Sequence, residues 1–283
     1  MRGLFVLSAA IGACALIVWF GPATAERLVP LLGGFQQSMA AVETLYTVVI
    51  FGALLLVALA GGTLCKLNPF RMGEHRAAML ILGALAGAAG ILAATLYARL
   101  AGSLDPGVAT PGFVVTILWG SLVILFAAAV EEIYFRGWLQ PVLARDYGLP
   151  VALLLSSLAF AALHVMGGAR SPTTLANLFL GGLVFGLLAA RGGGLAGAIA
   201  AHFTWNWTEQ IALGLDPNPG MGSFGALADL ELTGPAIWGG SDEGLNASIA
   251  MTVALFALLV PLLIWARDSL VPISAGSRPA PAE

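Results

Sequence analysis

Long apolar runs separated by short polar segments dominate the pattern along this chain. A helix that crosses a bilayer needs about 20 apolar residues, and eight runs reach or approach that length. They lie at roughly 4–20, 42–62, 78–100, 113–133, 151–166, 175–190, 194–213 and 247–266. The pattern therefore predicts an all-α fold, a polytopic transmembrane bundle of about eight helices.

The composition agrees with this pattern. Of 283 residues, 59% are hydrophobic and only 10% are charged, and the mean hydropathy is +0.93. Glycine pairs such as Gly83 and Gly87 predict tight contacts between membrane helices. We find neither an internal repeat nor a separate soluble region, so residues 1–283 are expected to form a single integral membrane domain. We expect this domain to interact with the lipid bilayer and to bind no nucleic acid.

The first apolar run has two interpretations. Arg2, the run itself and the small residues Ala23 to Ala25 resemble a signal peptide with a cleavage site. The run is long for such a peptide, so we favour a retained helix over cleavage of residues 1–25.

Several polar or reactive residues receive no functional role. Cys14 and Cys65 fall in or beside apolar runs, so no disulfide framework is expected. His75 lies in a basic loop and is interpreted as solvated, and Ser156 and Ser157 are interpreted as packing residues.

Lys and Arg favour the cytoplasmic side of a membrane protein, so their distribution predicts its orientation. With the N-terminus in the cytoplasm, the inside segments carry nine basic residues and the outside segments carry three, namely Arg27, Arg99 and Arg170. Both termini are then cytoplasmic. The longest loop, 214–246, is acidic, has no Lys or Arg and is rich in Gly and Pro. We expect it outside, with little regular structure, capping the bundle or contacting a substrate or partner.

Three polar groups interrupt the apolar runs: Glu131, Glu132 and Arg136, then His164, then His202 with Asn206. An ionisable group deep in a bilayer costs a few kcal/mol and normally faces a partner or a watery cavity. Taken singly, each group suits a structural role. At 1.5 Å per residue, however, Glu131 and His164 both lie about 21 Å from the expected cytoplasmic helix ends, and His202 about 16 Å. Tilt and a kink expected at Pro141 shift each depth by several Å, but the three groups still lie at comparable depth near the middle of the membrane, so they predict one shared site.

Helix spacing separates the two glutamates. Glu132 and Arg136 are four residues apart and can pair on one helix face, whereas Glu131 points about 100° away. Glu131 is therefore the candidate general base. By the same spacing, His202 shares a face with Asn206, and Phe160 lies beside His164 and could shape the pocket.

These residues suit the hydrolysis of an amide bond. Glu131 can deprotonate a water molecule that one histidine helps to orient, while the other histidine and Asn206 donate to an oxyanion. Alternatively, Glu131, His164 and His202 are sufficient ligands for a catalytic zinc ion. The three are dispersed and no His-Glu-x-x-His helix is present. Spacing leaves both chemistries open.

The motifs resemble those of a known family. "EEIYFRG" fits Glu-Glu-x-x-x-Arg, "FAALH" fits Phe-x-x-x-His and "HFTWN" fits His-x-x-x-Asn. In this order they resemble the CPBP family of intramembrane proteases, which includes CAAX proteases, bacteriocin-processing enzymes and the Ras-converting endopeptidase. The resemblance covers about residues 113–210, which predicts a catalytic core at about 113–213.

The resemblance implies a role for each matched residue. Glu131 would activate the water, His164 would help to position it, and His202 and Asn206 would bind the water or stabilise the oxyanion. Glu132 and Arg136, the other two matched residues of the first motif, would support the site. The family is described both as metalloproteases and as metal-free glutamate proteases. We favour the metal-free mechanism and keep a divalent metal such as zinc as the alternative cofactor.

The resemblance also implies a membrane-associated protein or peptide as substrate. Eukaryotic relatives remove a tripeptide after a prenylated cysteine, and bacterial relatives are linked to bacteriocin immunity, peptide maturation or processing of sorting tails. The signal-like N-terminus, the Gly and Ala content and the charge bias favour a bacterial inner-membrane protein, so a prenylated substrate is not expected. Two rival functions stay open: a non-catalytic membrane partner or immunity protein, and a proton-coupled transporter.

Overall fold

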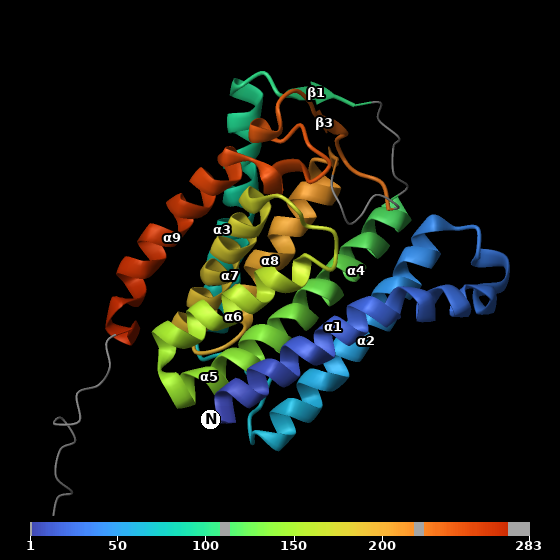
Figure 1. The fold of residues 1–283 in the computed structure, drawn as a ribbon. Coiled ribbons are helices and arrows are strands. Elements are labelled where there is room, and N and C mark those ends of the chain that lie inside the picture. The colour runs from blue at the N-terminus through green and yellow to red at the C-terminus, as the bar shows by residue number, and fades with distance from the viewer. Residues whose placement is uncertain (1, 108–113, 218–223, 271–283) are drawn as a thin grey trace, which may run out of the picture.

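The computed structural model describes residues 2–107, 114–217 and 224–270 and forms a bundle of long helices with short strands at one end (Figure 1). Among the described residues, six helical segments are long and apolar enough to cross a membrane. The protein is therefore an all-α, polytopic integral membrane protein. The helices are α1 (Arg2–Leu28), α2 (Met39–Leu64), α3 (Arg76–Leu100), α4 (Val114–Glu132), α5 (Gln140–Tyr147), α6 (Leu149–His164), α7 (Pro172–Gly192), α8 (Ala196–Trp207) and α9 (Ile249–Leu270).

Two of the eight predicted spans form α-helices of fewer than 18 residues. The runs at 151–166 and 194–213 form α6 and α8, which have 16 and 12 α-helical residues. Helix α6 is thus about 24 Å long at 1.5 Å per residue, less than the ~30 Å hydrocarbon core.

The predicted long fourth helix is continuous from Val114 to Tyr147. Between α4 and α5 it contains a π-helical segment, η2 (Ile133–Leu139), which ends just before the first turn of α5. Pro141 lies in that turn and has no N–H to donate, so regular α-helical bonding is interrupted where the kink was expected. π-Helical turns recur at functional sites, and this one carries Arg136.

Glycines bring α3 and α8 into direct backbone contact. A Cβ atom on Gly83 would collide with the carbonyl oxygen of Gly197, and one on Gly87 would collide with that of Ala201. The tight packing predicted for Gly83 and Gly87 is therefore present. It fixes the position of α8 immediately before His202.

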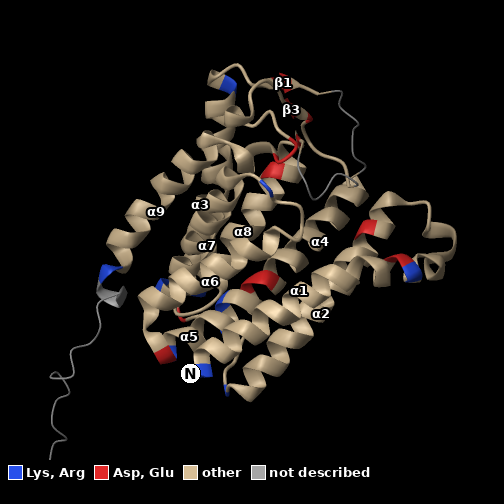
Figure 2. Cartoon of the chain, in the orientation of Figure 1, with Lys and Arg blue, Asp and Glu red and all other residues tan. Residues whose placement is uncertain are grey.

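The buried apolar side chains form two large clusters. One is built from α3, α7, α8 and α9 with the strand region, and the other from α1, α2, α6 and the long helix that contains α4 and α5. In the second cluster, the Tyr134 hydroxyl donates to the carbonyl oxygen of Ala10 on α1 (2.6 Å). Figure 2 shows most charged residues near the ends of the bundle, with a few inside it. The polar network described below joins the two clusters.

The expectation of little regular structure in loop 214–246 is wrong for its described part. Strands β2 (Leu215–Asp216) and β3 (Leu230–Leu232) form a sheet with β1 (Leu104–Pro106), in the order β1-β3-β2. β1 pairs antiparallel to β3, and β2 pairs parallel to it. Two 3-10 turns follow, η4 (Ala236–Trp238) and η5 (Gly244–Ala247). Strands of two or three residues show no alternating pattern in a sequence, so they were missed.

This loop is tied to the start of α7. The Glu243 carboxylate accepts hydrogen bonds from the backbone N–H groups of Arg170 (3.1 Å) and Ser171 (2.8 Å). Partial burial would raise the pKa of Glu243, but hydrogen bonds from the Thr174 side chain and these two N–H groups, with the charge of Arg170, lower that pKa below its ordinary value. The Asn177 amide also donates to the backbone oxygens of Asn246 and Ser248. The loop therefore closes over one end of the region that holds the polar residues.

Candidate active site

A cavity of about 180 Å³ opens among α4, α6, α7 and α8. Polar residues on its wall come from all four helices, with Asn177 on α7, and the apolar Phe185 also comes from α7. The four predicted catalytic residues all line it: Glu131, His164, His202 and Asn206. Their side chains, far apart in the sequence, thus border one shared space.

Beside the cavity, Glu132 and Arg136 form a completely buried ion pair. Arg136 Nη1 lies 2.9 Å from Glu132 Oε1. Arg136 Nη2 donates to the carbonyl oxygen of Gly182 on α7 at 2.9 Å, and the guanidinium lies 4.8 Å from the centre of the Phe160 ring. The pair predicted from the four-residue spacing is therefore present. It joins the long helix to both α6 and α7.

Glu132 also holds His202, a contact that spacing did not predict. His202 Nδ1 lies 2.8 Å from Glu132 Oε1. A carboxylate oxygen accepts, so Nδ1 carries the donated hydrogen. The ring stacks on Phe185, with centroids 4.7 Å apart and planes 14° apart. Both contacts fix the ring so that Nε2 faces Glu131 Oε2 at 3.8 Å.

His164 occupies the last position of α6. Its Nδ1 lies 2.8 Å from the carbonyl oxygen of Phe160, which can only accept, so Nδ1 again carries the hydrogen. The Phe160 and His164 rings lie 4.6 Å apart. In this tautomer the neutral ring keeps Nε2 as an acceptor.

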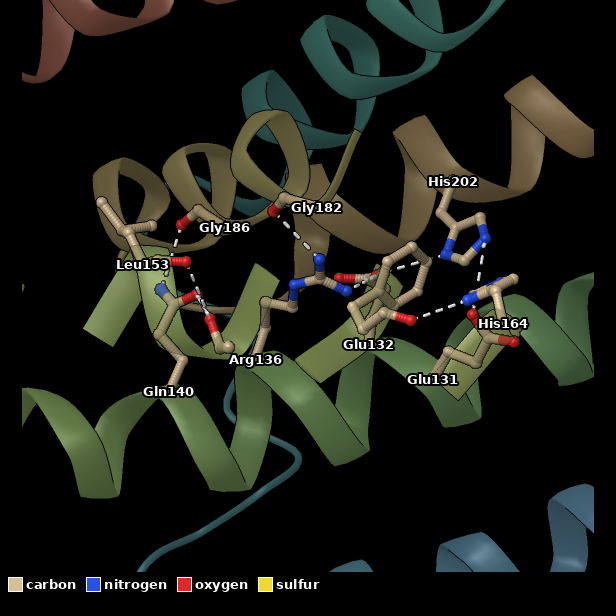
Figure 3. A network of polar contacts seen from close by, with 11 residues as sticks. Glu131, Glu132, Arg136, Gln140, Leu153, His164, Gly182, Gly186 and His202 are labelled. Carbon is tan, nitrogen blue, oxygen red and sulfur yellow. Dashed lines mark hydrogen bonds and ion pairs between the residues drawn. The ribbon is translucent and has the colours of Figure 1, made fainter. Parts of the chain in front are cut away.

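Glu131 is the more accessible of the two glutamates. Its side chain is 19% exposed, whereas that of Glu132 is 0% exposed. Buried Glu131 Oε2 has no hydrogen-bond partner in the described part of the chain. Figure 3 shows Glu131, His164 and His202 at one end of the polar network, and Gln140 with Gly186 at the other. A carboxylate oxygen with unused acceptor capacity thus faces two oriented imidazoles.

Sequence reasoning missed a second carboxylate in the cavity. Glu209 lines the wall and lies in a π-helical segment, η3 (Thr208–Ala212), that continues α8. The spacing could have revealed Glu209, because residues 202, 206 and 209 follow the i, i+4, i+7 pattern of one helix face. Phe185, which stacks on His202, gave no such signal because it is one of many apolar residues on α7.

The described residues contain no preformed cluster of metal ligands, and a metal ion at Glu131, His164 and His202 stays an alternative prediction. Among residues 2–107, 114–217 and 224–270, no group of three or more His, Cys, Asp or Glu side chains is arranged to hold a metal ion. Glu131, His164 and His202 border the same cavity without converging as a ligand set. The donor geometry therefore gives no support to zinc at these residues.

Residues 112–208 match a family model described as Rce1-like, Type II CAAX prenyl endopeptidase Rce1-like. No curated protein matches the chain. The matched residues include all three motifs, so the finding agrees with the resemblance to the CPBP and CAAX proteases over this part of the chain. Glu209 lies just beyond the matched range.

Proposed function

We propose that this membrane protein is an intramembrane endopeptidase that hydrolyses a peptide bond in a membrane-associated protein or peptide, with water activated by Glu131. The observation that carries the proposal is the shared cavity of Glu131, His164, His202 and Asn206. The family match over residues 112–208 supports the reaction class.

In the proposed reaction, Glu131 takes a proton from water as the water oxygen bonds to the substrate carbonyl carbon. Nε2 of His164 accepts the other water hydrogen and orients the nucleophile. The carbonyl oxygen becomes an oxyanion, stabilised by hydrogen bonds from the Asn206 amide and the His202 ring. The C–N bond then breaks, and the proton held by Glu131 moves to the leaving nitrogen.

Glu132 serves the reaction from outside the cavity. Its Oε1 is engaged by both Arg136 and His202, and its side chain is fully buried. It therefore holds the His202 ring in place while Arg136 compensates its charge. No step of this reaction requires a metal ion. Metal analysis of purified, active protein, with chelator controls, tests whether the reaction is independent of metal.

The direct test compares membranes from cells that express the natural protein or Glu131→Gln. This substitution keeps the shape of the side chain and removes the base. We expect peptide termini that the natural protein generates to be missing with Glu131→Gln, as measured by proteomics of protein ends. The variant must retain the thermal unfolding midpoint of the natural protein.

A Glu131→Gln protein that generates the same termini as the natural protein contradicts the proposal. That result would favour the non-catalytic partner function. Exposed Glu74 provides the matched control, and Glu74→Gln is expected to leave the pattern of termini unchanged.

A further inference from the structure

Glu209 is a buried carboxylate that the proposed reaction does not use. Its side chain lines the cavity, and the residue is only 5% exposed. Among the described residues, it has neither a hydrogen-bond partner nor a charged partner. Each of the other buried charges at the site, Glu132 and Arg136, has a partner of opposite charge. An unpartnered carboxylate inside a membrane protein costs several kcal/mol and normally marks a functional site.

The position of Glu209 connects it to the reaction centre. Trp205 and Asn206 precede it by four and three residues on the same continuous helix, and all three line the cavity with His202. Asn246 from the loop that closes over this region also lines it. Glu209 therefore lies within the space that a substrate must enter to reach Glu131.

The charges of the cavity determine what kind of group fits beside Glu209. Among its described lining residues are two carboxylates, Glu131 and Glu209, and no Lys or Arg. Arg136 is occupied by Glu132 and the carbonyl oxygen of Gly182. A carboxylate of a substrate would meet the like charge of Glu131 and Glu209, and no Lys or Arg among the described lining residues offsets it. A cation would meet a carboxylate in a region of low dielectric constant, where attraction is strong.

The apolar part of the wall also suits a cation. Phe160, Phe185 and Trp205 line the same cavity, and aromatic rings attract a cation placed over their faces. A long side chain with an apolar stem and a charged end matches a cavity that combines these rings with one carboxylate.

We infer that Glu209 forms an acidic subsite that binds a lysine or arginine side chain of the substrate close to the bond that is cleaved. This inference rests on the proposed protease function and adds a substrate class to it. Truncating one partner of a buried charge pair weakens binding more than about tenfold, so the subsite should dominate sequence preference.

Cleavage of a complex peptide pool tests the subsite. Purified protein in detergent is incubated with peptides made from membrane proteins by chymotrypsin, which leaves Lys and Arg inside peptides. For the natural protein, we expect Lys and Arg to be enriched at one position near the cleavage sites. Glu209→Gln should lose the enrichment, Glu209→Asp should keep part of it, and Glu209→Lys should favour Asp and Glu.

A pair of synthetic peptides measures how strongly the subsite prefers lysine. One carries lysine at the enriched position and the other carries norleucine, which has a similar length and no charge. We expect kcat/KM of the natural protein to favour the lysine peptide at least about tenfold, and Glu209→Gln to bring the ratio close to one. Exposed Glu231 on β3 supplies the control, and Glu231→Gln should leave the ratio unchanged.

Measurements of peptide binding distinguish a failure of this inference from a failure of the proposed function. Affinities of the two peptides are measured for Glu131→Gln and for Glu131→Gln with Glu209→Gln, neither of which is expected to cleave. If Glu131→Gln binds the lysine peptide more tightly than the norleucine peptide and the double variant does not, the result supports the subsite. An absence of Lys or Arg preference in the natural protein, or a preference that survives Glu209→Gln, overturns it. An active Glu131→Gln protein instead contradicts the proposed function, whatever Glu209 does.

Discussion

Glu131 and Glu132 are neighbours in the chain, yet the helix places them in different surroundings. Glu132 is fully buried between Arg136 and His202, while Glu131 borders the cavity. The adjacent residues point about 100° apart, so one carboxylate stabilises the site while the other remains accessible to a substrate. Their substitution should therefore have different consequences.

We expect Glu132→Gln to destabilise the protein by about 3–5 kcal/mol, because it leaves the Arg136 guanidinium buried without its counter-charge. The double variant Glu132→Gln with Arg136→Gln should recover part of this loss. Glu131→Gln should change stability little, since its contact with His202, at 3.8 Å, is too long for a hydrogen bond. Thermal unfolding in detergent measures all three, and equal losses for Glu131→Gln and Glu132→Gln would contradict the division of roles.

At the residue scale, the sequence predicts which side chains border the cavity better than how they contact one another. The four-residue spacing was enough to predict the pair of Glu132 with Arg136. The bond from Glu132 to His202 depends on how α8 is rotated about its axis, which no local spacing determines. Glu209 could have been found from its seven-residue spacing to His202, but it lies near the end of an apolar run, where a charged residue is usually interpreted as solvated.

At the element scale, the position of α8 depends on its close contact with α3. Gly87→Ala should push α8 away, because the new methyl group would collide with the Ala201 carbonyl oxygen and the Thr204 side chain. Crowding of this kind typically costs about 1–3 kcal/mol. We expect both a lower unfolding midpoint and reduced cleavage, since the shift moves His202 relative to Glu132.

Gly52 provides a matched control for that variant. It lies within α2, and a Cβ atom there would meet nothing within 4 Å. Gly52→Ala should therefore leave cleavage unchanged and stabilise the helix slightly, because alanine favours helix more than glycine does. Similar effects of both substitutions on cleavage would show that the α3–α8 contact does not position the site.

At the scale of the whole molecule, hydrophobic patterning was sufficient to predict the class of fold. Apolar runs of about 20 residues have few other stable arrangements than a helical bundle in a bilayer. The pattern did not reveal that α6 ends at His164 or that α8 becomes π-helical after Trp207. Those endings depend on contacts between helices, and they place the ends of two helices at the cavity. The small sheet at one end of the bundle likewise depends on pairing between distant segments, and so has no local signature.

The orientation in the membrane remains a prediction that labelling can test. In a variant with Cys14 and Cys65 replaced by alanine, single cysteines at exposed Glu74 and exposed Glu231 report on opposite sides. Because basic residues favour the cytoplasm, we expect a membrane-impermeant maleimide to label Glu231→Cys in intact cells and Glu74→Cys only after permeabilisation. The reverse pattern would invert the proposed topology. It would also place the loop bearing Asn246, which borders the cavity, on the cytoplasmic side, so that substrates would meet this loop from inside the cell.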